Sequence, residues 1–411
     1  MTTTVPGATA PVTPGRTREG GRLVVQAWLA SRGLIALVAL VLAVTTHRSV
    51  TDMVSNWDVQ HFARLAAGGY WADADGTLMA FFPGFPGLLA LGLRVGVPVA
   101  ITGVVVSLAC SGVAAGALAR LGGPAAAVAW LFAPTAVFTA VPYTESMFCA
   151  AAFWAWERAR ADRWVAAALL AAVACTVRVS GLFLIGALAV MILTTPRVAL
   201  RGLEGGRPPT PPAGIRSLAL AKPRVRRLAL LLVPAAVIAV FATYLHALSG
   251  SWTAWYHAQS TGWVRELTWP WQSFLNTIPA VVPGAYADHP WWAAVFRGEM
   301  VSMAVGLLVV VWAVVRSVRL LRAGEPPLWG DAAWVGVQVL AFSLSYWFFS
   351  VNRATLLWFP LWIMLAEWAR RRPRTPATRI GHRSLVGIAF ALEVVLMLWW
   401  CWLFFTGHWA S

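Results

Sequence analysis

The first long polar interval of the chain carries a carboxylate and an imidazole just outside an apolar segment. Asp58 follows Trp57 in SNWDVQHFARLAAGGYW, and His61 lies four residues after that tryptophan. Trp57, His61 and Leu65 recur at the spacing of one helix face, which predicts an amphipathic helix on the membrane surface with Asn56 as its N-cap. Asp58 in its first turn either acts on a substrate, as a carboxylate that can accept a proton, or only favours the helix dipole.

A second carboxylate and two isolated cations lie near the ends of later apolar runs. Glu145 follows the short gap PYT, where it either favours the dipole of the next helix or faces the same outer vestibule as Asp58. Arg178 interrupts the apolar run CTVRVSGLF, and Arg353 stands in SVNRATLLWFP. A cation at such a place is costly unless it reaches the interface, pairs with an acid or binds an anion. Two such arginines could bind a phosphate.

A proline-rich aromatic stretch returns the chain to the membrane after the first polar interval. Residues 80–86 read AFFPGFP, with Pro83 and Pro86. Proline removes a hydrogen-bond donor and fixes the backbone, so we predict no regular helix over these residues. They either line a cavity or form an ordinary turn into the bilayer.

The elements that must position these residues are membrane helices. The 411 residues are 59% hydrophobic and only 12% charged, about half the charged fraction of a soluble domain. The apolar runs predict an all-α, polytopic integral membrane fold of about eleven transmembrane helices, with amphipathic helices in the first outer loop. The predicted spans are 26–46, 97–119, 123–141, 144–160, 164–177, 180–195, 228–248, 298–317, 331–349, 354–369 and 385–405. The pair 164–177 and 180–195 and the short 354–369 are the spans most readily broken or re-entrant.

Charge predicts how these helices are oriented. The net charge is +16, and the arginines fall mainly in short gaps between apolar runs, a pattern typical of cytoplasmic loops and not of nucleic-acid binding. With a cytoplasmic N-terminus, 24 basic residues lie inside and 7 outside. Residues 1–25 are expected to be a disordered cytoplasmic tail and 26–411 a single membrane domain. Its outer loops are 47–96 and 249–297, and its basic cytoplasmic loop is 197–227.

The second outer loop, 249–297, is rich in tryptophan. Tryptophan favours the membrane interface, so this loop either anchors the chain along the bilayer surface or forms a wall for a lipid chain or a sugar ring. Glu393 stands in the middle of the last predicted helix as a candidate ion-pair partner. The four cysteines lie in apolar runs without metal-ligand spacing, and no nucleotide-binding or nucleophile-elbow motif is present. We therefore expect no metal and no cofactor.

The motifs together resemble one family of membrane enzymes. WDVQHFARLAAGGYW, AFFPGFP, PYTESMF, RVSG and NRATLLWFP are similar to the PIG-V family of membrane mannosyltransferases, from about residue 50 to the C-terminus. That family is similar to the wider GT-C glycosyltransferases, so the resemblance implies a GT-C-like bundle with its active site on the extracytoplasmic face. It also implies an inverting transfer of mannose from a polyprenyl-phosphate sugar donor.

The predicted site contains six residues, of which the resemblance assigns a role to Asp58, while the chemistry of the side chains suggests roles for His61, Glu145, Arg178 and Arg353. Asp58 maps onto the catalytic carboxylate of the first outer loop. His61, Arg178 and Arg353 are candidates for stabilising the donor phosphate, Glu145 for orienting a sugar hydroxyl or the acceptor, and Tyr70 belongs to the Gly-Tyr part of the most specific motif. Family members often carry a glutamate shortly after that pair, whereas this chain has Trp71, Asp73 and Asp75.

The acceptor is left open between a lipid, a glycan and a protein. An arginine-rich chain with one lysine suggests a GC-rich bacterial source and a plasma-membrane location, in contact with membrane lipids and with no nucleic-acid partner. The alternative function is a transporter or lipid flippase that uses Arg178, Glu393 and Glu145 as a path inside the membrane. A non-catalytic scaffold is a third reading, under which Asp58 has no essential role.

Overall fold

The computed structural model describes residues 14–72, 76–195 and 223–410. The regular secondary structure in these ranges is helical, apart from one isolated bridge between Leu267 and Ser345. Outside these ranges lie the predicted tail up to residue 13, Asp73, Asp75 and most of the basic loop.

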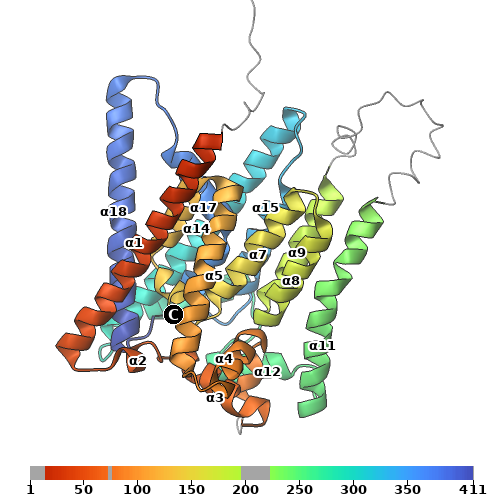
Figure 1. Cartoon of the computed structure of the whole chain (residues 1–411), viewed down its shortest axis with the longest axis vertical. Coiled ribbons are helices and arrows are strands. Elements are labelled where there is room, and N and C mark those ends of the chain that lie inside the picture. Colours follow the sequence, from red (N-terminus) through yellow and green to blue (C-terminus); the bar gives the residue numbers. More distant parts are fainter. Residues whose placement is uncertain (1–13, 73–75, 196–222, 411) are drawn as a thin grey trace, which may run out of the picture.

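Figure 1 shows the arrangement of the helices. In chain order the elements are α1 (Pro14–Thr46), α2 (Val50–Met53), α3 (Asp58–Gly68), η1 (Gly69–Ala72), η2 (Thr77–Ala80), α4 (Gly84–Arg94), α5 (Val99–Gly122), α6 (Pro124–Leu131), η3 (Ala136–Thr139), α7 (Glu145–Arg160), α8 (Trp164–Val177), α9 (Ser180–Thr194), α11 (Leu232–Ser249), α12 (Ala254–Trp263), α13 (Pro270–Val281), α14 (Pro290–Arg322), α15 (Trp329–Ser343), α16 (Val351–Ala354), η4 (Thr355–Leu357), α17 (Phe359–Ala369) and α18 (Pro376–Thr406).

Five helices in the described ranges are long and apolar enough to cross a membrane: α1, α5, α11, α14 and α18. A helix needs about 20 apolar residues to span the roughly 30 Å hydrocarbon layer. The predicted spans 164–177, 180–195 and 354–369 correspond to the shorter apolar helices α8, α9 and α17. The protein is therefore a multi-pass membrane protein, and the count of eleven spans stays a prediction.

Several predicted elements differ from the structure. Residues 14–25, expected as part of a disordered tail, form the first part of α1. The expected span 123–141 is broken into α6 and the short η3, because Pro134 cannot continue the hydrogen-bond ladder of α6. The prediction that 80–86 avoids a helix holds only to Pro83, since α4 begins at Gly84 and contains Pro86. Proline is tolerated there because N–H groups in a first turn have no partner within the helix. The last helix begins at Pro376, earlier than predicted, where Thr375 caps it.

The core surrounds α7, which contacts α5, α8 and η4. Alanines of α5, α7 and α8 are buried in these contacts, and small side chains let membrane helices approach closely. Figure 1 places α3, α4 and α12 together at one end of the bundle, called here the α3 end. The first turn of α7 lies at this end, because Tyr143 just before it bonds to the start of α3.

Ion pairs tie the opposite end of α7 to its neighbours. Arg160 donates to both carboxylate oxygens of Asp331 on α15, at 2.7 and 2.6 Å. Glu157 accepts from Arg120 of α5 at 2.6 Å and also from Arg158. These ion pairs fix one end of α7. The other end of α7 lies at the α3 end of the bundle and carries residues of the candidate site.

Candidate functional site

A strained turn at the start of α3 positions Asp58. Trp57, the residue before it, has φ 59° and ψ −125° and supplies no side-chain cap, a conformation that costs about 1–3 kcal/mol in a non-glycine residue. The backbone N–H of Asp58 donates to the Tyr143 hydroxyl at 3.3 Å. The predicted N-cap role of Asn56 is wrong, because its amide donates instead to the carbonyls of Met53 and Phe404. That use of Asn56 ties the turn to the end of α18.

A break between two apolar helices positions Arg178. α8 ends at Val177, Arg178 is extended with φ −153° and ψ 153°, and α9 begins at Ser180, as the interrupted run predicted. The Arg178 Nη1 donates to Glu145 Oε1 at 2.6 Å and to Thr144 Oγ1 at 2.8 Å. Glu145 is fully buried, so it serves here as a counter-ion within the protein.

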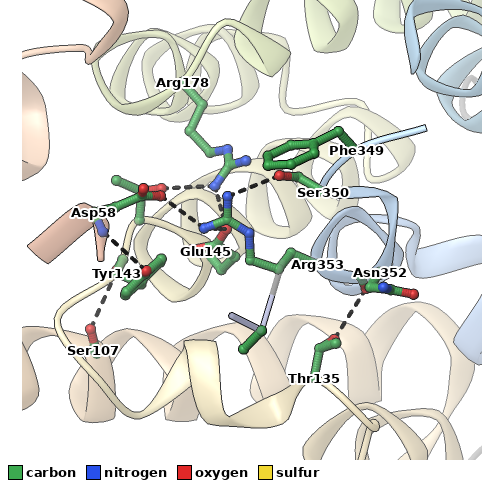
Figure 2. A network of polar contacts seen from close by, with 12 residues as sticks. Asp58, Ser107, Thr135, Tyr143, Glu145, Arg178, Phe349, Ser350, Asn352 and Arg353 are labelled. Atoms are coloured by element: carbon green, nitrogen blue, oxygen red, sulfur yellow. Dashed lines mark hydrogen bonds and ion pairs between the residues drawn. The ribbon is translucent and has the colours of Figure 1, made fainter. Parts of the chain in front are cut away.

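Arg353 joins the two carboxylates. Its Nη1 lies 2.9 Å from Asp58 Oδ2 and 3.8 Å from Glu145 Oε1, and its Nη2 donates to Ser350 Oγ at 3.2 Å. Figure 2 shows its guanidinium between Asp58, Glu145 and Ser350, with that of Arg178 beside it. Burial disfavours a charged Arg353, but the nearby Asp58 and Glu145 outweigh it and raise its pKa above the ordinary value. Arg353 is therefore a permanent cation in this site.

A buried carboxylate holds the short helix α16 that carries Arg353. Glu299 of α14 is fully buried. It accepts the backbone N–H groups of Ser350, Val351 and Asn352, at 3.1, 2.5 and 2.9 Å. Ser350 has φ 64° and gives no side-chain cap, so an acid on another helix satisfies the orphan donors of α16. Sequence reasoning assigned Glu299 no role.

These residues border a cavity of about 450 Å³ at the α3 end, within the size range of ligand pockets. Its charged lining side chains are Asp58, Arg178, Arg265 and Arg353, whereas the buried Glu145, which pairs with Arg178, does not line it. Aromatic side chains line much of the remainder: Phe62, Phe81, Phe82, Phe183, Trp255, Tyr256, Trp263 and Phe342. The combination of cations, one accessible carboxylate and aromatic walls suits an anionic ligand that also has an apolar part.

Arg265 is the lining residue that sequence reasoning missed. It follows α12, lies over the rings of Phe342 and Phe349 at 5.8 Å, and donates from Nη2 to the Phe349 carbonyl at 3.4 Å. No carboxylate of the described residues lies within ion-pair distance of it. Burial, followed by the neighbouring cations Arg353 and Arg178, lowers the pKa of Arg265 to about 10. The available signal was an arginine inside the tryptophan-rich loop 249–297.

Of the six predicted site residues, the structure brings Asp58, Glu145, Arg178 and Arg353 together. It does not place the other two among the residues that line the cavity. His61 stacks on Phe81 with ring centroids 5.4 Å apart. Tyr70 donates its hydroxyl to the Phe81 carbonyl at 2.6 Å. It therefore fixes the position of Phe81, which lines the cavity, without lining the cavity itself. In the described residues no cluster of three or more histidine, cysteine or acidic side chains forms a candidate metal site.

Comparison with known proteins gives a partial match. No family model matches the chain. GPI alpha-1,6-mannosyltransferase 2 of Mus musculus is 32% identical over 152 residues, which cover 32% of this chain and 30% of that protein. The same protein of Rattus norvegicus is 32% identical over 154 residues, again covering 30% of its length. This chain thus matches less than a third of the length of these relatives.

Two solved structures align with most of this chain. The archaeal oligosaccharyltransferase AglB from Archaeoglobus fulgidus, in complex with an inhibitory peptide and a dolichol-phosphate, aligns at a TM-score of 0.48 and 12% identity. The alignment covers 96% of this chain and 56% of that one. ArnT from Cupriavidus metallidurans, bound to undecaprenyl phosphate, aligns at 0.46 and 13% identity, covering 96% and 77%.

Proposed function

We propose that the protein is a membrane glycosyltransferase that moves mannose from a polyprenyl-phosphate mannose donor to an extracytoplasmic acceptor. The observation that carries this proposal is a single cavity in which Asp58 lies beside three arginines, Arg178, Arg265 and Arg353. Such a site can hold a phosphate and place a base beside it. The partial likeness to mammalian mannosyltransferases supports mannose as the sugar.

The charge of the site suits a monophosphate donor. The three arginines with Asp58 and Glu145 leave one net positive charge, which matches the single negative charge of a phosphodiester. When Asp58 takes up a proton, the net charge of the site becomes two positive. The leaving phosphate monoester then carries about −1.5 to −2, so the site balances charge before and after the transfer.

The proposed reaction is one inverting displacement. The acceptor hydroxyl oxygen forms a bond to the anomeric carbon while the bond from that carbon to the phosphate oxygen breaks. The electron pair leaves with the phosphate, which the arginines stabilise. The hydroxyl proton moves to the Asp58 carboxylate, and the new glycosidic bond has the opposite anomeric configuration. Since Asp58 contacts Arg353 at 2.9 Å, the phosphate of the donor must draw Arg353 away before Asp58 can act as the base.

The acceptor is proposed only by class, as a lipid, glycan or protein on the far side of the plasma membrane from the cytoplasm. The α3 end of the bundle would then face outward, with the N-terminus of the chain in the cytoplasm. The transporter alternative needs a path through Arg178, Glu145 and Glu393. No observation favours that path, because Arg178 and Glu145 pair with each other and Glu393 lines a different cavity.

The deciding experiment measures transfer from labelled polyprenyl-phosphate mannose in membranes that contain equal amounts of each variant. Asp58→Asn keeps the shape of the side chain and removes the base, so we expect transfer to fall at least a hundredfold. Asp52→Asn is the matched control, because Asp52 is exposed nearby and does not line the cavity. Equal transfer by wild type and Asp58→Asn would remove Asp58 as the base. Absence of transfer in wild type with a panel of polyprenyl-phosphate sugars would overturn the proposed donor class.

A further inference from the structure

A second and larger cavity lies on the other side of α16 from the site. It measures about 1030 Å³ and is lined mainly by apolar side chains of α6, α14, α17 and α18. Asn352 and Thr355 border this cavity, whereas Ser350 and Arg353 of the same segment border the site. Its volume is at the upper end of that of ligand pockets. None of the residues assigned to sugar transfer lines it.

Among the described residues, two charged side chains line this cavity, Arg297 and Glu393. The packing of α14 on α18 gives the relative depth of Arg297 and Glu393 along the bundle. Gly298 of α14 faces Trp400 of α18, because a methyl group added to Gly298 would lie 3.3 Å from the Trp400 ring. Arg297 is therefore level with Trp400, near the α3 end. Glu393 lies seven residues before Trp400, or about 10 Å deeper along the helix axis.

Both charged side chains lack a charged partner among the described residues. Arg297 donates from Nε to the Val281 carbonyl at 2.9 Å, and no acid lies within ion-pair distance of its terminal nitrogens in that part of the chain. Glu393 makes no hydrogen bond or ion pair with a described residue and sits among apolar walls. A carboxylate in such surroundings is costly and tends to be neutral, and a neutral carboxyl donates one hydrogen bond.

We propose that this cavity binds one anionic glycerophospholipid of the surrounding membrane. The lipid phosphate would pair with Arg297, an acyl ester carbonyl below it would accept from the Glu393 carboxyl, and the chains would run along the apolar wall. A polyprenyl phosphate offers the same phosphate but no ester carbonyl, so the position of Glu393 argues for a glycerolipid. This inference concerns a cavity outside the proposed transfer site and does not depend on sugar transfer.

The test is a binding measurement that needs no activity. The full chain is purified in detergent and stripped of lipid, and phosphatidylglycerol binding is titrated by native mass spectrometry. We expect one tight equivalent in wild type and about tenfold weaker binding in Arg297→Gln and in Glu393→Leu, because each change removes one hydrogen-bonded contact to the lipid. Arg94→Gln and Glu325→Gln, which change exposed residues outside the cavity, are expected to bind like wild type. Glu393→Gln keeps a donor and is expected to retain most of the affinity.

A diether analogue of phosphatidylglycerol, which lacks the ester carbonyls, tests the role of Glu393. We expect it to bind wild type about tenfold less tightly than the ester lipid and to be insensitive to Glu393→Leu. Undecaprenyl phosphate bound as tightly as phosphatidylglycerol, with no effect of Glu393→Leu, would overturn the glycerolipid assignment. Equal phosphatidylglycerol binding by wild type and Arg297→Gln, with unchanged melting temperatures, would overturn the site itself.

Discussion

At the scale of single residues, the site is defined by which arginines are already paired. Arg178 and Arg353 each contact a carboxylate, whereas Arg265, among the described residues, donates to a carbonyl, lies over two rings and has no carboxylate within ion-pair distance. A cation that has no direct ion pair and lines a cavity of low polarity attracts an anion strongly. Arg265 is therefore expected to contribute most to donor binding, and Arg353 to exchange its contact with Asp58 for the phosphate.

Replacing Arg265 by glutamine should raise the KM for the polyprenyl-phosphate donor about tenfold to a hundredfold with a smaller change in kcat. The reason is the loss of a charge-assisted hydrogen bond of about 1.5–3 kcal/mol to the phosphate. Steady-state kinetics with a fixed acceptor measure it. Arg94→Gln, which changes an exposed arginine outside this cavity, is the matched control. An unchanged donor KM would exclude Arg265 from the phosphate site.

The lowered pKa of Arg265 gives the same contact a pH dependence. The side chain is charged below its pKa of about 10 and loses its charge as the pH rises through that value. Donor KM in wild type should therefore rise as the pH approaches 10. The profile of Arg265→Gln should be flat over that interval, and an identical rise in both proteins would assign the titration to another group.

At the scale of elements, the site depends on two interruptions of regular structure. The break between α8 and α9 presents Arg178, and the short α16 presents Arg353. Each interruption is fixed by a specific contact. Gly181 allows α9 to approach α8, since a methyl group there would lie 2.7 Å from the α-carbon of Cys175. Glu299 fixes α16 through three backbone N–H groups.

Gly181→Ala should lower the melting temperature and reduce transfer, although alanine is the better helix former. The added methyl group meets backbone that cannot move aside, so α9 and Arg178 must shift. Gly186→Ala in the same helix has open space around the new methyl group and should be neutral or slightly stabilising. Thermal unfolding in detergent distinguishes the two changes, and equal melting temperatures would contradict the predicted close approach.

Glu299→Gln should lower kcat about tenfold while the donor KM changes less. Glutamine has one acceptor oxygen where Glu299 uses two, so part of the contact to α16 is lost at about 1–3 kcal/mol, and Arg353 is held less well. Glu299→Asp retains the charge and should recover part of the activity. Glu325→Gln, an exposed change, is the control. A loss of melting temperature with normal kinetics in the folded fraction would make the role of Glu299 purely structural.

At the scale of the whole molecule, charge and chemistry are separated along the bundle. Salt bridges around Asp331 and Glu157 lie at the end of α7 opposite Asp58. Most arginines of the sequence fall in the loops predicted to be cytoplasmic, and basic loops are retained on that side. The α3 end should therefore face away from the cytoplasm, where a lipid-linked sugar and its acceptor would meet.

Single cysteines test this orientation. Asp288→Cys and Glu325→Cys change two exposed residues before α14 and after it. An impermeant maleimide added to intact cells should label the first and not the second, because the two positions lie on opposite sides of a spanning helix. Broken cells should allow both to react, which controls for accessibility. Labelling of Glu325→Cys alone in intact cells would reverse the proposed topology.

The sequence by itself determined the fold class and four of the residues that meet at the site. Apolar runs must be helical in a membrane, since backbone groups there need internal partners, and the costly placement of Arg178 in an apolar run marked it for pairing. Local spacing also located Asp58 at the start of an amphipathic helix.

Tertiary structure alone decided how these residues are used. Arg265 and Glu299 are separated from Asp58 by more than 200 residues. No local pattern could therefore reveal that Arg265 borders the same cavity as Asp58, or that Glu299 fixes the short helix that carries Arg353. The turn of Tyr70 toward Phe81 also depends on packing. Periodicity records which residues share a face of one helix, whereas a site is made where several helices end together.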